Sequence, residues 1–176
     1  MDKLIYRFNN QGTQSSFNSR KILGGKGANL AQMAKLGLPV PPGFTISTKV
    51  CEYFYKNNKK IPKKLIQQSK KEIKIIEKIS KKKFGDLSSP LLVSVRSGSR
   101  VSMPGMMDTI LNLGLNDKTV IALKNKTFNG RFAKDSYRRL IQMYGNVVLG
   151  IEPHFFEELI ENYKLTKGVI QDTELQ

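Results

Sequence analysis

Basic residues stand beside glycine and serine at two places in this 176-residue chain. The first is residues 23–27 (LGGKG), and the second is residues 96–100 (RSGSR), which directly follow the apolar run 91–95. Glycine and serine let a ligand approach the backbone closely, and lysine and arginine supply positively charged donors. Both places are therefore candidate phosphate-binding sites.

Lys26 is flanked by Gly25 and Gly27, and the residues that follow have the spacing of an amphipathic helix. At a helix N-terminus, the backbone N–H groups and the helix dipole favour an anion. The segment matches neither of two common phosphate loops, because Arg20 replaces the first glycine of a P-loop and Leu30 replaces the third glycine of a dinucleotide fingerprint. From the residues alone, a phosphate-binding lysine and a solvated lysine in a glycine turn are equally open.

Arg96 is the stronger candidate, because a sheet would fix its backbone at the end of a predicted strand. From there its guanidinium can donate two parallel hydrogen bonds to phosphate oxygens. Ser97 and Gly98, which follow it, make an ordinary surface arginine the less favoured interpretation. Arg100 lies further into the predicted loop and is the weaker of the two arginines.

Three methionines surround a Pro-Gly pair in residues 103–107 (MPGMM). Methionine usually fills cores, but a segment that crosses between two strands cannot be buried throughout. We therefore interpret it as a flap that packs on a flat ring such as a purine, with Met103, Gly105 and Met106 in contact with the ligand. Asp108 beside the flap is a single carboxylate, which makes a poor magnesium site.

The chain has one cysteine and one histidine, so it contains no internal disulfide and no Cys-His or multi-ligand metal pattern. Cys51 is predicted to be a small buried residue of a helix. His154 is predicted to lie on a helix surface, because spacing suggests no acid–base partner for it. The residues by themselves therefore show no pattern of catalytic residues or metal ligands.

The formal net charge of +16 raises the question of nucleic-acid binding. Most of the excess is local, since residues 56–83 hold twelve lysines and two glutamates. The basic segment lacks interleaved aromatic residues and is rich in lysine rather than arginine, unlike surfaces that read or stack bases. A solvated amphipathic helix is the favoured interpretation, and we expect neither nucleic-acid nor membrane binding.

The remaining pattern predicts an α+β fold with a small sheet, a long basic helix and a C-terminal helical segment. Ser47 or Thr48 is expected to cap a helix that ends near Tyr55, and the last helix is expected to turn Phe155, Leu159 and Ile160 inward. We expect an N-terminal α/β part over residues 1–115 and a helical part over 116–176. The sequence has no apolar run long enough for a membrane span and no signal-peptide pattern, so we expect a cytoplasmic protein. Strands are predicted at 4–8, 44–46, 91–95 and 110–115, and helices at 28–37, 48–55, 62–84, 117–126, 131–147 and 153–164.

Three segments together resemble the N-terminal part of pyruvate, phosphate dikinases: residues 23–44 (LGGKGANLAQMAKLGLPVPPGF), 82–117 (KKFGDLSSPLLVSVRSGSRVSMPGMMDTILNLGLND) and 130–144 (GRFAKDSYRRLIQMY). Phosphoenolpyruvate synthases resemble the glycine-lysine segment and the Val-Arg-Ser strand end, but they differ over the Met-Pro-Gly-Met-Met-Asp-Thr segment. That segment therefore favours the dikinases.

The resemblance implies an incomplete ATP-grasp-type nucleotide-binding domain that binds ATP with Mg²⁺. In the family, phosphate passes from ATP through a phosphohistidine to pyruvate, and AMP, diphosphate and phosphoenolpyruvate are formed. Lys26 and Arg96 match the family's ATP-phosphate-binding residues, and residues 98–107 match its mobile loop over the nucleotide. Gly25, Gly27, Ser97, Gly98 and Arg100 adjoin these positions and are included in the expected ATP site.

The same resemblance implies that the metal ligands, the phosphohistidine domain and the pyruvate-binding barrel lie outside this chain. We therefore expect the isolated chain to lack full activity and to have the missing remainder of the dikinase as its partner, in an enzyme that forms homo-oligomers. Two alternatives remain at this point. The first alternative to a dikinase fragment is a phosphoenolpyruvate synthase-like ATP-binding module, and the second is a basic binding or structural remnant without catalysis.

Overall fold

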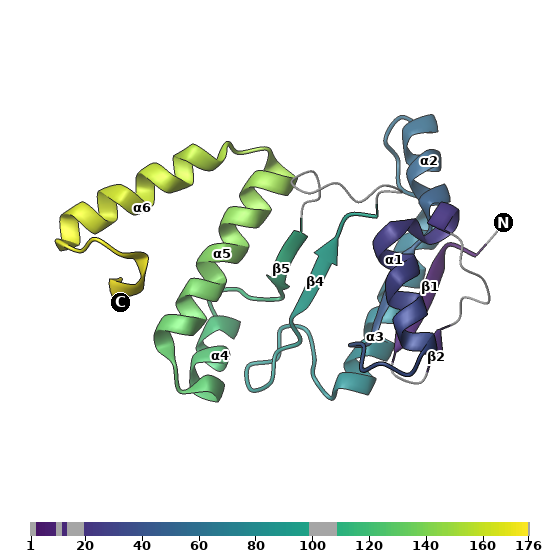
Figure 1. Cartoon of the computed structure of the whole chain (residues 1–176), viewed down its shortest axis with the longest axis horizontal. Coiled ribbons are helices and arrows are strands. Elements are labelled where there is room, and N and C mark those ends of the chain that lie inside the picture. Colours follow the sequence, from purple (N-terminus) through teal and green to yellow (C-terminus); the bar gives the residue numbers. More distant parts are fainter. Residues whose placement is uncertain (1–2, 10–11, 14–19, 99–108, 176) are drawn as a thin grey trace. The chain divides into compact units, whose positions relative to one another are not determined.

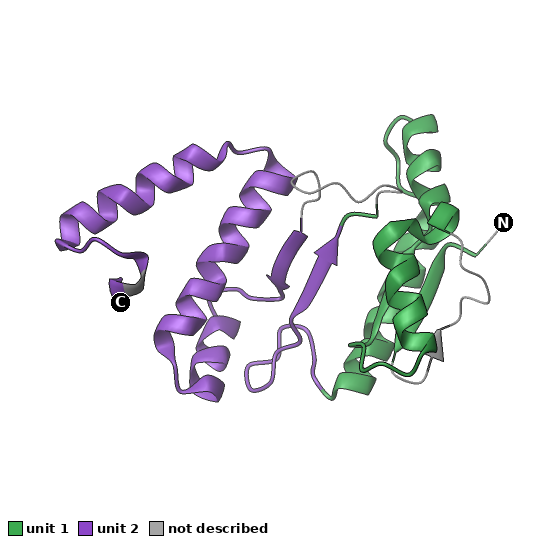
Figure 2. Cartoon of the chain, viewed as in Figure 1, with its two compact units in different colours: residues 1–81, 97–107 green, residues 82–96, 108–176 purple. Residues whose placement is uncertain are grey.

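The computed structural model describes residues 3–9, 12–13, 20–98 and 109–175. These residues form two compact units, which Figure 2 distinguishes by colour. Unit 1 comprises residues 1–81 and 97–107, and unit 2 comprises residues 82–96 and 108–176. Each unit is described by itself below.

Unit 1 is built around a small antiparallel sheet with β1 (Ile5–Asn9) at its centre. β1 pairs with β2 (Gly12–Thr13) on one side and with β3 (Gly43–Ile46) on the other, where Ile5 lies opposite Ile46. Helices α1 (Arg20–Lys35) and α3 (Lys63–Ser80) both pack against β1, and α2 (Thr48–Lys56) packs against α1 (Figure 1). The buried core joins the elements through Leu4, Ile5, Val50 and Leu65.

The helix ends of unit 1 follow from local chemistry. Ser47 caps α2, because its hydroxyl accepts a hydrogen bond from the backbone N–H of Lys49. The basic helix α3 ends at Ser80, earlier than the predicted Phe84, because Lys81 takes the left-handed conformation that stops a helix. On its apolar side Leu65 and Ile76 are buried, while Ile66 is exposed.

An ion pair with two hydrogen bonds joins β1 to α3. Arg7 donates from Nε to Glu72 Oε2 at 2.7 Å and from Nη2 to Oε1 at 3.0 Å. The two side chains are only 26% and 16% exposed, so water screens the pair less than it screens a surface pair. The hydrogen bonds that Arg7 donates to the carboxylate of Glu72 raise the pKa of Arg7 above its ordinary value.

We expect Glu72→Gln to destabilise the chain by about 1–3 kcal/mol, because it leaves a partly buried guanidinium without its carboxylate. The free energy of unfolding from urea denaturation measures this loss. Glu158→Gln, at an exposed position of the last helix, is the control, and we expect a change of less than about 0.5 kcal/mol for it. Equal losses in both variants would contradict the proposed contribution of the ion pair.

Unit 2 combines a two-stranded antiparallel sheet with helices. β4 (Val93–Arg96) pairs with β5 (Thr109–Leu113), and α5 (Gly130–Leu149) packs on β5 and on α4 (Thr119–Thr127), as Figure 1 shows. Its buried core includes Ile110, Leu115 and Leu140. α6 (Pro153–Lys167) and a short 3₁₀ turn (Asp172–Glu174) complete the described part of the unit.

Several details of unit 2 were predictable from the sequence. Asp135 pairs with Arg139 at 2.8 Å, as the spacing of four residues along a helix predicts. The side chain of Asn116 caps the start of α4 by accepting from the N–H groups of Lys118 and Thr119. Gly130–Leu149 covers the predicted long amphipathic helix.

Three expectations about side-chain burial meet different outcomes. Cys51 is exposed, so its prediction as a buried residue was wrong. On α6, Phe155 and Leu159 are 54% and 67% exposed, so the prediction that they point inward was also wrong, while Ile160 is partly buried. His154 is exposed on the helix, as predicted, and its ring lies 4.1 Å from that of Phe155.

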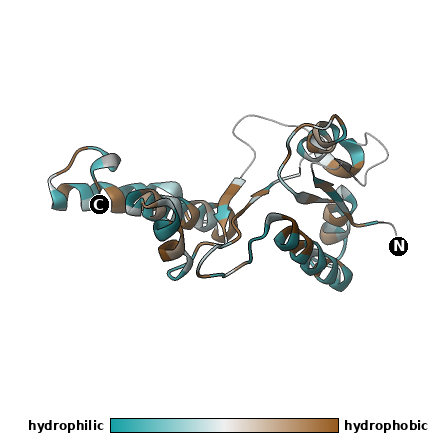
Figure 3. Cartoon of the chain, turned by 90° about the horizontal axis from the view of Figure 1, so that it is seen from below, coloured by the Kyte–Doolittle hydropathy of each residue, from teal (hydrophilic) through white to brown (hydrophobic). Residues whose placement is uncertain are grey.

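The described residues thus form an α+β structure with two small antiparallel sheets. The predicted division of the module at residue 115 stays a prediction; in the structure, β4 and β5 lie in the same compact unit as α4 and α5. Within the described residues, no helix is long and apolar enough to cross a membrane. Figure 3 shows hydrophilic and hydrophobic stretches side by side along α6, the helix near the C-terminus.

Candidate functional site

The glycine-lysine segment forms a kink inside α1. Gly24 has φ 69° and ψ 174°, which breaks the helix into a first turn from Arg20 and a second helical piece that carries Lys26. Only glycine adopts this conformation readily. The prediction that glycines precede a helix N-terminus is therefore confirmed for the second piece, although a helical turn also precedes them. Gly25 and Lys26 are partly buried at this point, and Gly27 is buried.

The kink at Gly24 was not predicted from the sequence, although the Gly24-Gly25 pair could have indicated a break in the helix. The role of Gly27 was not predicted either. A Cβ at Gly27 would lie 2.6 Å from Cγ2 of Thr45 and 3.0 Å from its Oγ1, so the glycine lets α1 approach β3 closely. This packing role is independent of any ligand, and Thr45 could not be recognised as the neighbour from sequence spacing.

We expect Gly27→Ala to destabilise the chain by about 1–3 kcal/mol, because the added methyl group overlaps Thr45 in a well-packed contact. A double-mutant cycle with Thr45→Ala, read by urea denaturation, tests the contact directly. The Thr45→Ala change removes both conflicting atoms, so the double variant should recover most of the loss. Additive losses would show that Gly27 is required for another reason.

Arg96 is the last residue of β4 and lies opposite Thr109 of β5. Arg96, Ser97 and Gly98 are all exposed. Among the residues that the structure describes, no hydrogen bond or ion pair engages the side chain of Arg96 or that of Lys26. The prediction that a strand fixes the backbone of Arg96 is confirmed.

The turn before β4 is held by Asp86. Its Oδ1 accepts hydrogen bonds from the backbone N–H and hydroxyl of Ser88 at 2.8 and 2.7 Å and from the N–H of Ser89 at 2.6 Å. The hydroxyl of Ser88 contributes most to lowering the pKa of Asp86 to about 2, followed by the two N–H groups. This turn leads directly to the strand that ends in Arg96.

The structure places the predicted site residues in separate groups. Gly25, Lys26 and Gly27 share one helical turn of unit 1, while Arg96 ends a strand of unit 2. Ser97 and Gly98 directly follow Arg96 in the chain. The remaining predicted contacts lie outside the described residues, and so does Asp108. These contacts are Arg100, Met103, Gly105 and Met106.

Two surface hollows of unit 2 lie away from these residues. One, of about 400 Å³, lies beside Lys124, Phe128 and Gly130, and the other, of about 310 Å³, lies between α5 and α6. In the described ranges, no three side chains of His, Cys, Asp or Glu come together as a metal site would require. The described residues therefore offer basic groups for an anion but do not by themselves fit a magnesium ion.

The comparisons with known proteins include the glycine-lysine segment in the part of the chain that they match. The sequence profile of the family described as "Pyruvate phosphate dikinase, AMP/ATP-binding domain" matches residues 20–82, which include Lys26. Arg96 lies beyond the matched range.

Curated relatives named pyruvate, phosphate dikinase match most of the chain. The protein from Entamoeba histolytica is 54% identical over 157 residues, which cover 89% of this chain and 18% of that protein. Those from Rhizobium meliloti and Clostridium symbiosum are 53% and 50% identical over 175 residues, which cover 99% of this chain and 20% of each relative. The chain thus spans about one fifth of the length of these relatives.

These similarities do not favour a phosphoenolpyruvate synthase-like module. The model of the pyruvate phosphate dikinase AMP/ATP-binding domain family matches residues 20–82, and nearly the whole chain is similar to the N-terminal part of pyruvate, phosphate dikinases.

Proposed function

We propose that this chain is the N-terminal ATP-binding part of a pyruvate, phosphate dikinase, built on an ATP-grasp-type domain. The complete enzyme would convert ATP, phosphate and pyruvate to AMP, diphosphate and phosphoenolpyruvate. The observation that carries the proposal is the family match over residues 20–82, which contain a lysine at the start of a helical piece kinked by glycine. A cytoplasmic, homo-oligomeric enzyme is part of the same proposal.

In this proposal Lys26 and Arg96 bind the phosphates of ATP by different means. Lys26 supplies a mobile positive charge beside the backbone N–H groups of Gly25 and Gly27, where the helix dipole also favours an anion. Arg96 supplies a planar guanidinium whose backbone is fixed by pairing with β5. Ser97, Gly98, Arg100 and the flap contacts Met103, Gly105 and Met106 complete the nucleotide side of the proposed site.

Phosphoryl transfer depends mainly on positioning and on stabilising the charge that spreads over the transferred group. Lys26 and Arg96 would contribute to both by orienting the phosphates and offsetting part of their charge. Magnesium would supply further charge stabilisation, but we place its ligands in the part of the enzyme outside this chain. The phosphohistidine is placed there too, and His154 is not proposed as that residue.

The test is an assay of the purified 176-residue chain with ATP, phosphate and pyruvate. We expect weak ATP binding by calorimetric titration and no phosphoenolpyruvate formation above background. Sustained formation of phosphoenolpyruvate by the chain alone would overturn the division of functions proposed here. The absence of ATP binding, both in the chain and in a chimera that completes it, would overturn the ATP site itself.

A further inference from the structure

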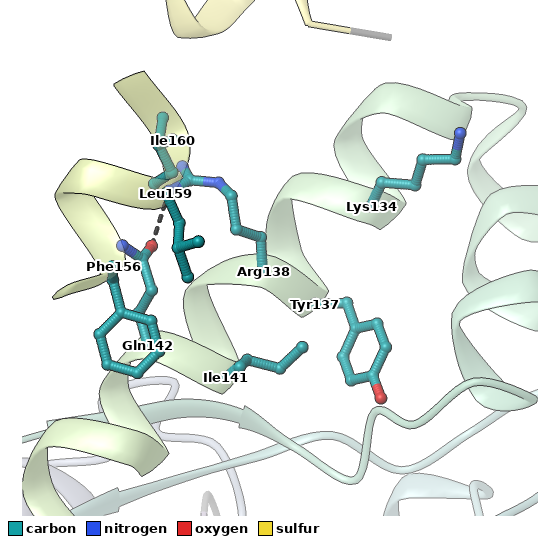
Figure 4. Close-up of a pocket in the computed structure, with 8 residues that line it drawn as sticks. All are labelled: Lys134, Tyr137, Arg138, Ile141, Gln142, Phe156, Leu159 and Ile160. Carbon is teal, nitrogen blue, oxygen red and sulfur yellow. Dashed lines mark hydrogen bonds between the residues drawn. The ribbon is translucent and has the colours of Figure 1, made fainter. Parts of the chain in front are cut away.

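The helical end of unit 2 carries a surface groove between α5 and α6. The apolar wall of this α5/α6 groove is made by Tyr137, Ile141, Phe156, Leu159 and Ile160, and Figure 4 shows the first two on α5 and the other three on α6. At about 310 Å³ it lies at the small end of the range for ligand pockets, roughly 300–1,000 Å³. Apolar side chains that line a surface groove commonly mark a protein contact.

The two helices are held close together at one point. A Cβ at Gly145 of α5 would lie 2.5 Å from Cζ of Phe156, so the absence of a side chain there lets the ring pack against α5. On the polar side of the groove, Arg138 donates to Gln142 at 2.6 Å (Figure 4). Arg138 also donates to Asp135 at 2.6 Å. The two helices that form the groove thus pack against each other at Gly145 and Phe156, and Arg138 beside it is already paired with Asp135.

The rest of α6 lacks a core of its own. Lys164 is the one buried residue of this 15-residue helix, where it pairs with Glu161 at 2.5 Å and Asp172 at 3.1 Å. Its large apolar side chains are mostly exposed, including Leu159 at 67% and Leu165 at 77%. Most helical stability in proteins comes from packing an apolar face, and a helix of this length is marginal without it. We therefore expect the exposed apolar face of α6 to be covered by another polypeptide segment.

We propose that the α5/α6 groove is the docking surface for the remainder of the dikinase polypeptide. The proposal rests on the proposed function, because it takes its partner from the same relatives. Those relatives are about five times as long as the chain, so four fifths of their length is available to cover this surface. The occupant is an apolar segment of that remainder, since the wall is apolar and Arg138 already has Asp135 as its carboxylate.

The test is a chimera in which this chain replaces the matched first fifth of the Rhizobium meliloti dikinase. Leu159→Cys is labelled with iodoacetamide in the 176-residue chain and in the chimera, with no nucleotide present. Peptide mass spectrometry separates this position from Cys51, which is exposed in the chain. Glu157→Cys, an exposed position of α6 outside the groove, is the matched control.

We expect labelling of Leu159→Cys to slow by at least about tenfold in the chimera, because the docked segment must open before the reagent reaches the thiol. Glu157→Cys should react equally in both proteins. Equal rates for Leu159→Cys in the chain and the chimera would overturn the proposal. Protection already present in the isolated chain, increasing with its concentration, would overturn it in favour of a second copy.

A dye titration gives a second test that needs no chimera. We expect the isolated chain to bind anilinonaphthalene sulfonate and Leu159→Ser to lower the fluorescence at saturation, while Glu157→Ser leaves it unchanged. Equal fluorescence in the two variants would mean that the groove is not an open apolar surface, and it would overturn the proposal. ATP titration of the chimera is read separately, so protection without ATP binding would count against the proposed function alone.

Discussion

Replacing Arg96 by alanine is expected to lower the affinity of the chain for ATP by about tenfold to a hundredfold. A hydrogen bond that involves a charged group contributes about 1.5–3 kcal/mol, and about 1.4 kcal/mol corresponds to a factor of ten. The strand pairing of Arg96 with Thr109 holds its backbone in place before ATP binds, so little ordering is required. Calorimetric titration of the wild-type chain and the variant with ATP measures the change.

Three further variants separate the causes of this loss. Arg96→Lys keeps the charge but removes the planar pair of donors, so we expect an intermediate affinity. Arg100→Ala should cost less than Arg96→Ala, since Arg100 is four residues further along the chain from the end of β4. Arg139→Ala is the control for net charge, because Arg139 is already paired with Asp135 on α5. Equal affinities of Arg96→Ala and Arg100→Ala would contradict the ranking of the two arginines.

The placement of Arg96 could be predicted because the signal is local. An apolar run followed by small and charged residues predicts a strand end, and β4 ends at Arg96. Ser47 as a helix cap and the Asp135–Arg139 pair were predictable for the same reason, since each depends on residues within one helical turn. Local patterns therefore located the cations of the proposed site and the elements that carry them.

The features that were not predicted depend on contacts between distant segments. Position 27 requires glycine because of its contact with Thr45, which is 18 positions away in the sequence. No pattern in either segment predicts this contact. Cys51 lies on an amphipathic helix whose buried face is set by the elements around it, and only Val50 of α2 is buried. The periodicity of a sequence predicts that a helix has an apolar face, but the elements that pack against the helix determine which of its residues are buried.

The last helix shows the same limit more clearly. Phe155 and Phe156 are adjacent, so spacing alone admits two orientations of α6, and the prediction chose the wrong phenylalanine. Gly145 decides between them, because it leaves room for the ring of Phe156 against α5. Leu159 and Leu165 then remain exposed, which is understandable if α6 packs in a larger protein. The failed prediction is thus what first indicates the α5/α6 groove.

Replacing Gly114 by alanine is expected to cost about 2–5 kcal/mol of unfolding free energy. Gly114 has φ 121°, a conformation that residues with a side chain rarely adopt, and a Cβ there would overlap the backbone carbonyl oxygen of Leu91. Backbone cannot move aside as a flexible side chain can, so the strain and the overlap act together. Urea denaturation of the variant measures the loss.

Gly150→Ala in the same unit is the matched control. Gly150 also has a positive φ, 71°, but no atom lies within 4 Å of the position that its Cβ would take. We expect a loss of about 1–2 kcal/mol there, from the backbone conformation alone. Both changes restrict the unfolded chain similarly, so their difference reports the overlap with Leu91. Equal losses would show that φ alone makes Gly114 necessary. If the loss is larger for Gly114→Ala, we also expect this variant to bind ATP more weakly. Gly114 directly follows β5, and Leu113 of β5 pairs with Val93 in the strand that ends at Arg96.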